Sequence, residues 1–413
     1  VCPVSLPNEY NERLDFRKAI YKMYPQAIPG AFGINKDGTA PCKATCPAHV
    51  SIQGFVALIN DGRPEEALKL FKEEHTFPGI CGRVCHHPCE SECTRAQVDQ
   101  SLAVRELHRF LGDFELEREE MYIPPPKVSK RSEKVAVIGS GPAGVTAAYE
   151  LLRQGYHVTI FEKQDEPGGM MRYGIPEYRL PRDILANEIK VVEKMGAELK
   201  CGVTFGKDIT LESLKADGYS ATFLAIGLHA GRKLGIENED IEGVLQGVDF
   251  LREASKGTKI KIGKEVVVVG GGNVAVDVAQ VAKRLGAEKV TLICLERREE
   301  MPAWEYEIAE ALEDDIEIVN SLGPRNLFLD NSSNRISGME FRSCTQVFDA
   351  DGRFSPEYDE SVCQTFNADT VIMAIGQSAD LEGITDQGIA ISRPGGLEAD
   401  PVTLQTPIDW VFA

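Results

Sequence analysis

The chain has 413 residues, a hydrophobic content of 43% and a formal net charge of −19 at pH 7. This length allows two or three domains with sizeable cores, and the negative charge argues against nucleic-acid binding, because phosphates require a basic face. No apolar run is as long as a membrane span, and no signal peptide opens the chain. Since it begins Val1-Cys2-Pro3 and ends Trp410–Ala413, we interpret it as a piece of a longer polypeptide.

The first 128 residues are predicted to contain an arm and a helical domain. Residues 1–37 hold several prolines and are predicted to form an arm with short helical pieces. Residues 38–128 are predicted to be helical, because IQGFVALINDGRPEEALKLFKEE has apolar residues at helical spacing, with a break near Asp61-Gly62-Arg63-Pro64. Pro124-Pro125-Pro126 indicates a linker to the next domain.

The helical region is rich in cysteine. The stretch CGRVCHHPCESEC places a thiol at every fourth position, which keeps near one helix face, but Pro88 breaks a helix interior and predicts a bent segment. The length of the chain indicates a reducing, cytoplasmic location rather than a secreted disulfide scaffold. The thiols are therefore predicted to bind a metal centre. The candidate ligands are Cys42, Cys46, Cys81, Cys85, Cys89 and Cys93.

Residues 134–144, KVAVIGSGPAG, form the first of two nucleotide-binding patterns. A predicted strand leads into Gly139, Gly141 and Gly144, a helix follows, and the next strand, HVTIFEK, carries Glu162 at its end. The first glycine allows a tight turn, the second lets a pyrophosphate approach, and the third lets the helix pack on the strand. The phosphates are expected at the helix N-terminus and the carboxylate near ribose hydroxyls.

The same pattern recurs at residues 265–296. EVVVVGGGNVAVD supplies Gly270, Gly272 and Ala275, and the strand KVTLICLE ends in Glu296. Two similar buried-type strands, ATFLAIG and DTVIMAIG, follow one nucleotide unit each and end in Gly227 and Gly376. This order predicts one dinucleotide domain (248–368) inserted in another (129–247 and 369–413).

Three stretches carry a family resemblance. PGGMMRYGIPEYRLP (167–181), GGGNVAVD (270–277) and EMPAW (300–304) resemble the small subunit of bacterial glutamate synthase and the matching modules of dihydropyrimidine dehydrogenase and of NADH-dependent ferredoxin:NADP transhydrogenase. The resemblance implies an α/β fold in which a helical [4Fe-4S] domain precedes an FAD domain with an inserted NAD(P)H domain. The opening, CPVSLPNEYNERLDFRKAIYKMYPQAIP, resembles the flavin-containing subunit of heterodisulfide reductases, with Cys2 as the last cysteine of a ferredoxin-type pattern.

The resemblance also implies the residues that bind the cofactors. The FAD candidates are Gly139, Gly141, Pro142, Ala143, Gly144, Glu162, Lys163, Gly168, Gly169, Met170, Arg172 and Gly227. The candidates for the nicotinamide dinucleotide are Gly270, Gly272, Asn273, Ala275, Asp277, Glu296, Arg297 and Arg298. Gly376 is a further cofactor-binding candidate. In the family a further flavin contact follows a segment like WVFA, and this sequence ends at Ala413.

The adjacent redox nucleotide domains favour iron–sulfur clusters over zinc, because zinc carries no electrons; disulfides are a third interpretation. Related proteins hold two [4Fe-4S] clusters, which take eight ligands, whereas six cysteines are grouped here. The resemblance implies one cluster on Cys46, Cys85, Cys89 and a fourth ligand at His108, with a surface position on an amphipathic helix as the alternative for this histidine. We therefore expect one or two clusters.

The choice of nicotinamide cofactor depends on the residues after the second strand. NADPH sites place arginine there to meet the 2′-phosphate, and relatives that use NADPH have Tyr-Arg-Arg. This chain has Leu295 and Glu296 at the arginine positions, which favours NADH, although Arg297 and Arg298 follow directly and leave NADPH as the alternative.

These patterns predict an oxidoreductase subunit that passes electrons between NADH, FAD and [4Fe-4S] clusters and onward to partner redox subunits of a heterodisulfide-reductase-like or ferredoxin-like complex. No acid–base residue is assigned. The alternatives are a flavin-based bifurcating subunit, the small subunit of glutamate synthase and a non-catalytic assembly module.

Overall fold

The computed structural model describes residues 39–330, 335–393 and 395–413, together with the backbone of four short strands nearer the start of the chain. The strands are β1 (Ser5–Pro7), β2 (Phe16–Lys18), β3 (Ile20–Tyr21) and β4 (Gly33–Ile34). Where this region is described, it therefore forms extended pairs rather than the predicted helical pieces. The other predictions for residues 1–37, including that for Cys2, lie outside the described residues.

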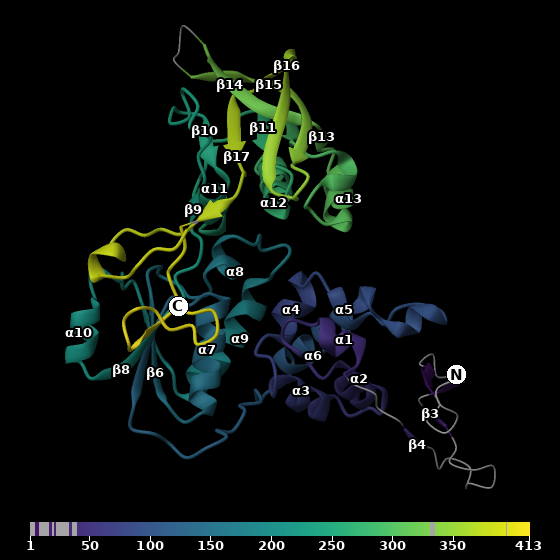
Figure 1. Ribbon diagram of the computed structural model, residues 1–413, viewed down its shortest axis with the longest axis vertical. Coiled ribbons are helices and arrows are strands. Elements are labelled where there is room, and N and C mark those ends of the chain that lie inside the picture. Colours follow the sequence, from purple (N-terminus) through teal and green to yellow (C-terminus); the bar gives the residue numbers. More distant parts are fainter. Residues whose placement is uncertain are drawn as a thin grey trace. The chain divides into compact units, whose positions relative to one another are not determined.

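The chain divides into two compact units, Val1–Pro125 with Ala186–Val191 and Pro126–Leu185 with Val192–Ala413. From residue 41 to residue 116 the first unit is helical (Figure 1). Its helices are α1 (Pro41–Thr45), α2 (Ile52–Asn60), α3 (Pro64–Lys72), α4 (Pro78–Val84), α5 (Pro88–Ser91) and α6 (Val104–Leu116), with a 3₁₀ turn at Thr94–Gln97. In the described chain, no helix has both the length and the apolar character of a membrane span.

Two predicted interruptions of these helices are confirmed. α2 ends at Asn60 and α3 begins at Pro64, because proline fits the first turn of a helix but not its interior. Likewise Pro88 begins α5, and His87 before it has a left-handed backbone with φ 46°. The cysteine series therefore bends between α4 and α5, as its proline predicted.

Two glycines allow the backbones of α4 and α6 to contact each other directly. A methyl group at Gly112 would lie 2.2 Å from the Cα of Gly79, and one at Gly82 would lie 2.4 Å from the Cα of Arg109. Since no larger residue fits at either crossing, the packing depends on these glycines. It places the helix that carries Cys81 directly against the helix that carries His108.

The second unit contains two five-stranded parallel sheets (Figure 1). The first has the order β19-β8-β5-β6-β7. Its strands are β5 (Lys134–Ile138), β6 (His157–Glu162), β7 (Glu198–Cys201), β8 (Tyr219–Leu224) and β19 (Val411–Phe412). Its helices are α7 (Pro142–Arg153), α8 (Met170–Tyr173), α9 (Arg182–Met195) and α10 (Leu211–Ala216). β5 is buried after its first residue, as is usual for a strand in the middle of a parallel sheet.

The second sheet repeats this plan in the order β10-β17-β11-β12-β13. Its strands are β10 (Val244–Gln246), β11 (Glu265–Val269), β12 (Lys289–Ile293), β13 (Glu317–Val319) and β17 (Thr370–Met373). Its helices are α11 (Gly247–Ser255), α12 (Asn273–Arg284) and α13 (Glu305–Glu313). Short antiparallel strands β9 (Ala230–Gly231) and β18 (Gln377–Ser378) pair beside it.

Between β13 and β17 the chain forms a three-stranded antiparallel sheet. It consists of β14 (Leu322–Leu329), β15 (Ile336–Phe348) and β16 (Phe354–Asn367). The sequence DNSSNRISG at 330–338 is rich in turn-forming residues and predicts a hairpin or surface turn between two of these strands. The antiparallel pairing of β14 with β15 agrees with a hairpin, and residues 331–334 of the turn lie outside the described chain.

Candidate functional site

The first glycine turn lies between β5 and α7, and its three glycines have different surroundings. Gly139 has φ 105°, and a methyl group there would lie 2.3 Å from the carbonyl oxygen of Ala225. A methyl group at Gly144 would lie 1.9 Å from the carbonyl oxygen of Gly139, whereas at Gly141 the nearest atom would be 3.9 Å away, the Cα of Gly169. The first and third glycines are therefore required by packing, and the second leaves space for a ligand.

Glu162 holds this turn from the end of β6. Its buried carboxylate accepts hydrogen bonds from the N–H of Ser140 at 2.9 Å, from the hydroxyl of Ser140 at 2.5 Å and from the N–H of Gln164 at 2.8 Å. The Ser140 oxygen in turn accepts the N–H of Gly168 at 3.1 Å. This network brings Gly168 and Gly169 to the turn, where a methyl group at Gly169 would lie 2.6 Å from the Cα of Gly141.

Other predicted flavin residues fall around the same turn. Pro142 and Ala143 are exposed in the first turn of α7, a helix long enough to favour phosphate at its N-terminus. Gly227 follows β8 with φ 68°. Two cationic candidates already have protein partners: Lys163 pairs with Asp380 at 2.8 Å, and Arg172 pairs with Glu166 at 2.8 Å. Met170 begins α8 next to Gly169.

The second glycine turn, between β11 and α12, repeats the first. Gly270 has φ 139°, and a methyl group there would lie 2.4 Å from the carbonyl oxygen of Ala374. At Gly272 the nearest atom to an added methyl group, in Pro302, would be 4.0 Å away. The Oδ1 of Asn273 accepts the N–H of Trp304 at 3.1 Å, so the EMPAW stretch packs on this turn. Ala275 is fully buried and forms the close helix–strand contact.

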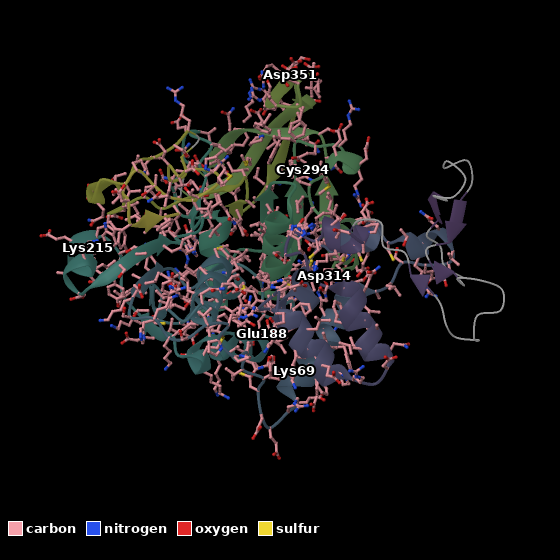
Figure 2. The ribbon with its side chains drawn as sticks, turned by 60° about the horizontal axis from the view of Figure 1, so that its bottom comes forward. Lys69, Glu188, Lys215, Cys294, Asp314 and Asp351 are labelled. Atoms are coloured by element: carbon pink, nitrogen blue, oxygen red, sulfur yellow. The ribbon has the colours of Figure 1, made fainter. Side chains whose placement is uncertain are left out.

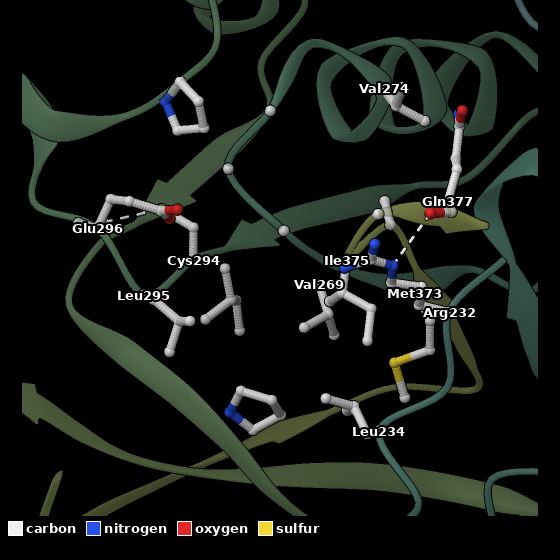
Figure 3. A pocket seen from close by; sticks show the side chains of 18 of the residues that line it. Arg232, Leu234, Val269, Val274, Cys294, Leu295, Glu296, Met373, Ile375 and Gln377 are labelled. Atoms are coloured by element: carbon white, nitrogen blue, oxygen red, sulfur yellow. Dashed lines mark hydrogen bonds between the residues drawn. The ribbon is translucent and has the colours of Figure 1, made fainter. Parts of the chain in front are cut away.

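A cavity of about 710 Å³ opens at this second turn (Figure 3). Figure 3 shows Cys294, Leu295 and Glu296 on one side of it, and Arg232 bonded to the carbonyl oxygen of Gln377 at 3.0 Å on another. The glycine turn 270–272 and Gly376 also line it. A methyl group at Gly271 would lie 2.6 Å from the Oε2 of Glu296. The carboxylate predicted to meet a ribose is therefore beside the phosphate-binding turn.

The remaining candidates for the nicotinamide site have other contacts. Arg298 binds both carboxylate oxygens of Glu305, at 2.7 and 3.0 Å, and Arg297 is exposed beside it. Asp277 does not line the cavity: its Oδ1 lies 3.2 Å from the Nε of Arg179. Burial raises the pKa of Asp277 to about 7, while the charge of Arg179 lowers it.

The six grouped thiols influence one another electrostatically. Burial is the largest cause of the raised pKa values of Cys42, Cys81, Cys85 and Cys89, and the charge of Cys46 contributes to all four. The pKa of Cys89 rises to about 12. Cys93 contributes to the raised pKa of Cys42. All six are free thiols, so the disulfide interpretation finds no support among the described residues.

His108 is buried in α6, so the interpretation of this histidine as a surface residue is wrong. Its ring centroid lies 5.2 Å from that of Phe55 and 4.8 Å from that of Phe71. Burial, with a smaller contribution from the charge of His75, lowers its pKa to about 4. Within the described residues neither ring nitrogen has a hydrogen-bond partner. Buried nitrogens of this kind normally have partners, so the ring of His108 has the free donor and acceptor capacity that a ligand would use.

The donor types fit an iron–sulfur cluster, which takes thiolates and in some centres imidazole. In the described chain, however, no three or more Cys, His, Asp or Glu side chains are arranged to hold a metal ion. Cys81 has a competing contact, since its Sγ lies 3.2 Å from the Nε2 of His75.

Sequence patterns did not identify three further features of these units. β16 places Phe354, Pro356 and Tyr358 at the cavity; its start is poorly marked by hydrophobic alternation. Arg179 contacts three carboxylates on the neighbouring helices. Glu188 is buried at 2% exposure and has no pattern that distinguishes it from other glutamates.

Two protein-family models match this chain, one over much of each of the two units. Residues 133–413 match the family model of the pyridine nucleotide-disulphide oxidoreductases, and residues 27–120 match the model of dihydropyrimidine dehydrogenase domain II with its 4Fe-4S cluster. The fold and the site thus define an oxidoreductase that uses flavin, pyridine nucleotide and iron–sulfur. The chain belongs to the pyridine nucleotide-disulphide oxidoreductase family, and the predicted resemblance to dihydropyrimidine dehydrogenase is confirmed.

Three relatives illustrate the similarity. The NADP(+)-dependent formate dehydrogenase subunit beta of Moorella thermoacetica is 39% identical over 402 residues, which are 91% of this chain and 56% of the relative. The NADPH-Fe(3+) oxidoreductase subunit beta of Geobacter sulfurreducens is 41% identical over 362 residues, 86% of this chain and 53% of the relative. The NAD-dependent dihydropyrimidine dehydrogenase subunit PreT of Escherichia coli K12 is 36% identical over 352 residues, 84% and 79% of the two chains. The chain thus spans about half of the first two relatives.

Among solved structures, Mycobacterium tuberculosis FprA in complex with NADPH shares the fold. It has a TM-score of 0.58 and 17% identity, with 68% of this chain and 78% of that chain covered.

Proposed function

We propose that this chain is an electron-entry module, which oxidises NADH at the second glycine turn, holds FAD at the first, and delivers electrons through [4Fe-4S] clusters of the helical unit to a partner redox subunit. One observation carries this proposal: the same ligand-admitting turn, with a carboxylate at the end of the next strand, occurs twice in one compact unit. A hydride donor and a flavin require one such site each. When bound, the flavin converts between hydride and single-electron chemistry.

We assign FAD to the domain built on the first sheet and the nicotinamide dinucleotide to the domain built on the second, inserted within the first. Because β10 (Val244–Gln246) and β17 (Thr370–Met373) pair in the second sheet, we extend the inserted domain beyond the predicted bounds 248–368 at both ends. The parallel pairing of β19 with β8 supports this assignment, because it joins the last residues of the chain to the first sheet. In chain order β17, which pairs with β11, is the last strand of the second sheet, and after it the chain goes back to the first sheet at β19.

NADH is the proposed donor because Glu296 borders the cavity next to Gly271. A carboxylate accepts hydrogen bonds from ribose hydroxyls and repels a 2′-phosphate. Arg298, the alternative partner of such a phosphate, is bound by both oxygens of Glu305. The names of the relatives include both NADP(H) and NAD, so the residues of this chain carry the argument.

We propose that at least one [4Fe-4S] cluster is held by Cys46, Cys85, Cys89 and His108. The unpartnered ring nitrogens of buried His108 support a ligand role, and Cys46 acts electrostatically on both Cys85 and Cys89. Cys42, Cys81 and Cys93 are proposed ligands of a second cluster that lacks one ligand among these residues.

The partner is proposed to be another redox subunit, because the formate dehydrogenase and NADPH-Fe(3+) oxidoreductase relatives are themselves named as subunits. A heterodisulfide-reductase-like partner rests only on the resemblance of the opening residues.

The test is an anaerobic titration of the holoprotein with NADH and, separately, with NADPH, while flavin absorbance and the EPR signal of reduced clusters are followed together. We expect NADH to bleach the flavin and to produce the cluster signal. Reduction by NADPH alone would overturn the assignment of Glu296. A purified holoprotein without flavin would contradict the proposal as a whole, and reduction by neither donor would favour the assembly module.

A further inference from the structure

Part of β16 forms a wall of two aromatic side chains and a proline at the cavity beside the second glycine turn. Phe354, Pro356 and Tyr358 all line the cavity, which places these three residues of the strand on the same side of it. Phe354 is 65% exposed although it is a large apolar side chain. The ring of Phe348 packs against it edge-on, with 6.2 Å between the centroids.

Backbone hydrogen bonds connect this wall to Glu296. The carbonyl oxygen of Glu296 accepts the N–H of Ser321 at 3.0 Å, and the carbonyl oxygen of Ser321 accepts the N–H of Cys344 at 2.8 Å. Cys344 is the β15 residue that pairs with Tyr358 on β16. Tyr358 therefore belongs to a strand that is hydrogen-bonded, through β15 and Ser321, to the backbone of Glu296, whose carboxylate is assigned to the ribose.

The ring of Tyr358 is held in place from two sides. A methyl group at Gly323 would lie 2.2 Å from the Cε1 of Tyr358 and 3.1 Å from a methyl carbon of Leu295, so the glycine gives the ring room next to Leu295. The guanidinium of Arg342 lies 3.8 Å from the centre of the ring. A fixed aromatic ring beside a cavity loses little conformational freedom when a flat ligand binds.

We propose that the β16 wall of Phe354, Pro356 and Tyr358 binds the adenine ring of the nicotinamide dinucleotide, with Tyr358 nearest the ribose and Phe354 at the mouth. This inference rests on the proposed function, since it names the occupant of the same cavity. In a dinucleotide the base is attached to the ribose that Glu296 would bind, and Leu295, Pro324 and Tyr358 are apolar or aromatic walls next to that carboxylate. Aromatic side chains stack on any base through its π-face.

The experiment measures ADP-ribose binding to the holoprotein by calorimetry and oxidation of reduced nicotinamide mononucleotide, which has no adenosine. Phe354→Ala and Tyr358→Ala are each expected to weaken ADP-ribose binding about ten-fold. Both should leave kcat/KM for the mononucleotide within about two-fold of the parent. Tyr358→Phe keeps the ring and is expected to retain most of the affinity.

Val362→Ala is the matched control, because Val362 is an exposed β16 residue that does not line the cavity. If both alanine variants bind ADP-ribose as tightly as the parent, or lose activity with the mononucleotide to the same degree, the adenine assignment is wrong. If the parent itself neither binds ADP-ribose nor is reduced by NADH, the proposed function fails instead.

Discussion

At the scale of single residues, the two carboxylates at the ends of β6 and β12 have similar positions and different surroundings. Glu162 uses both of its carboxylate oxygens to hold the first glycine turn and Gln164. Glu296 is fixed through its backbone carbonyl, which accepts the N–H of Ser321 and the side-chain amide of Asn320 at 3.1 Å, and its side chain lines the cavity. A charge change at Glu296 is therefore expected to alter ligand choice more than stability.

Glu296→Arg is predicted to shift the preference from NADH toward NADPH. A guanidinium attracts the 2′-phosphate that the carboxylate repels, and a charged hydrogen bond is worth about 1.5–3 kcal/mol. The ratio of kcat/KM for NADH over NADPH should fall by at least about ten-fold, as steady-state reduction of an artificial acceptor would measure.

Glu299→Arg is the control. This substitution changes the charge by the same amount, and Glu299 is exposed in the adjacent 3₁₀ turn. An equal shift in both variants would indicate a general effect of surface charge, and no shift in Glu296→Arg would remove this residue from the specificity argument.

At the scale of elements, each strand–turn–helix unit divides its tasks among the glycines. The first and third positions of the first turn have backbone atoms where a methyl group would lie, and the second has none within 3.9 Å. Substitution of the third glycine should therefore affect stability, and substitution of the second, three residues earlier, should affect ligand binding.

Gly144→Ala is predicted to lower the stability of the apoprotein by about 2 kcal/mol or more, because its methyl group would overlap the carbonyl of Gly139. Gly141→Ala, whose backbone φ of −69° suits alanine, should leave apoprotein stability nearly unchanged and reduce flavin retention. Thermal unfolding of the apoprotein and flavin content after gel filtration measure the two effects. Equal losses of stability in the two variants would contradict this division of roles between the two glycines.

At the scale of the whole second unit, Arg179 joins segments that are far apart in sequence. It precedes α9 and contacts Asp277 on α12 and Glu307 on α13, at 3.2 and 2.6 Å. Next to it, the hydroxyl of Tyr178 lies 3.0 Å from the Oε1 of Gln280. Asp277, expected at the nucleotide, therefore contributes to packing between the loop 176–181 and the second sheet.

Arg179→Gln is predicted to destabilise this unit by about 3 kcal/mol, because it leaves largely buried carboxylates without their cation. Adding Asp277→Asn should recover part of the loss, measured as the melting temperature in a double-mutant cycle. The matched control is Arg298→Gln, which removes an exposed ion pair with Glu305 and should cost less than about 1 kcal/mol. Equal effects of the two arginines would contradict the argument.

Residues Ala186–Val191 of α9 belong to the first, helical unit, and Glu188 among them is a buried carboxyl group that makes the stability of this unit depend on pH. Glu188, labelled in Figure 2, accepts the N–H groups of Gly79 and Ile80, at 2.5 and 3.1 Å. Burial raises its pKa to about 8, and these hydrogen bonds lower it in part. Between the ordinary glutamate pKa and about 8, the folded chain therefore binds more protons at this site than the unfolded chain.

Stability of the helical unit is accordingly predicted to fall as pH rises from about 5 to 8, by at most about 1.4 kcal/mol per pH unit from this group. Glu188→Gln should flatten that slope, and Glu193→Gln, at an exposed position of the same helix α9, should not. Calorimetric melting temperatures across this range test it; an unchanged slope in Glu188→Gln would refute the assignment.

The sequence alone determined the parts of this protein that depend on local spacing. Alternation of strand, glycine turn and helix located both nucleotide-binding turns, because small residues at fixed intervals, three glycines in the first turn and two glycines and an alanine in the second, have a steric reason at each position. Prolines at 64 and 88 located the breaks between helices, since the ring prevents a helix interior from continuing. The resemblance added the class of cofactors, and the family comparison confirmed it.

Only the tertiary structure decided which distant residues meet. It buried His108 against Phe55 and Phe71, paired Asp277 with Arg179 instead of the cavity, and brought β16 to the side of Glu296. Periodicity along the chain specifies which face of an element is apolar, but the partner of that face depends on how elements pack. Contacts such as Gly79 with Gly112 are set by side-chain volume across the fold, and no local pattern encodes them.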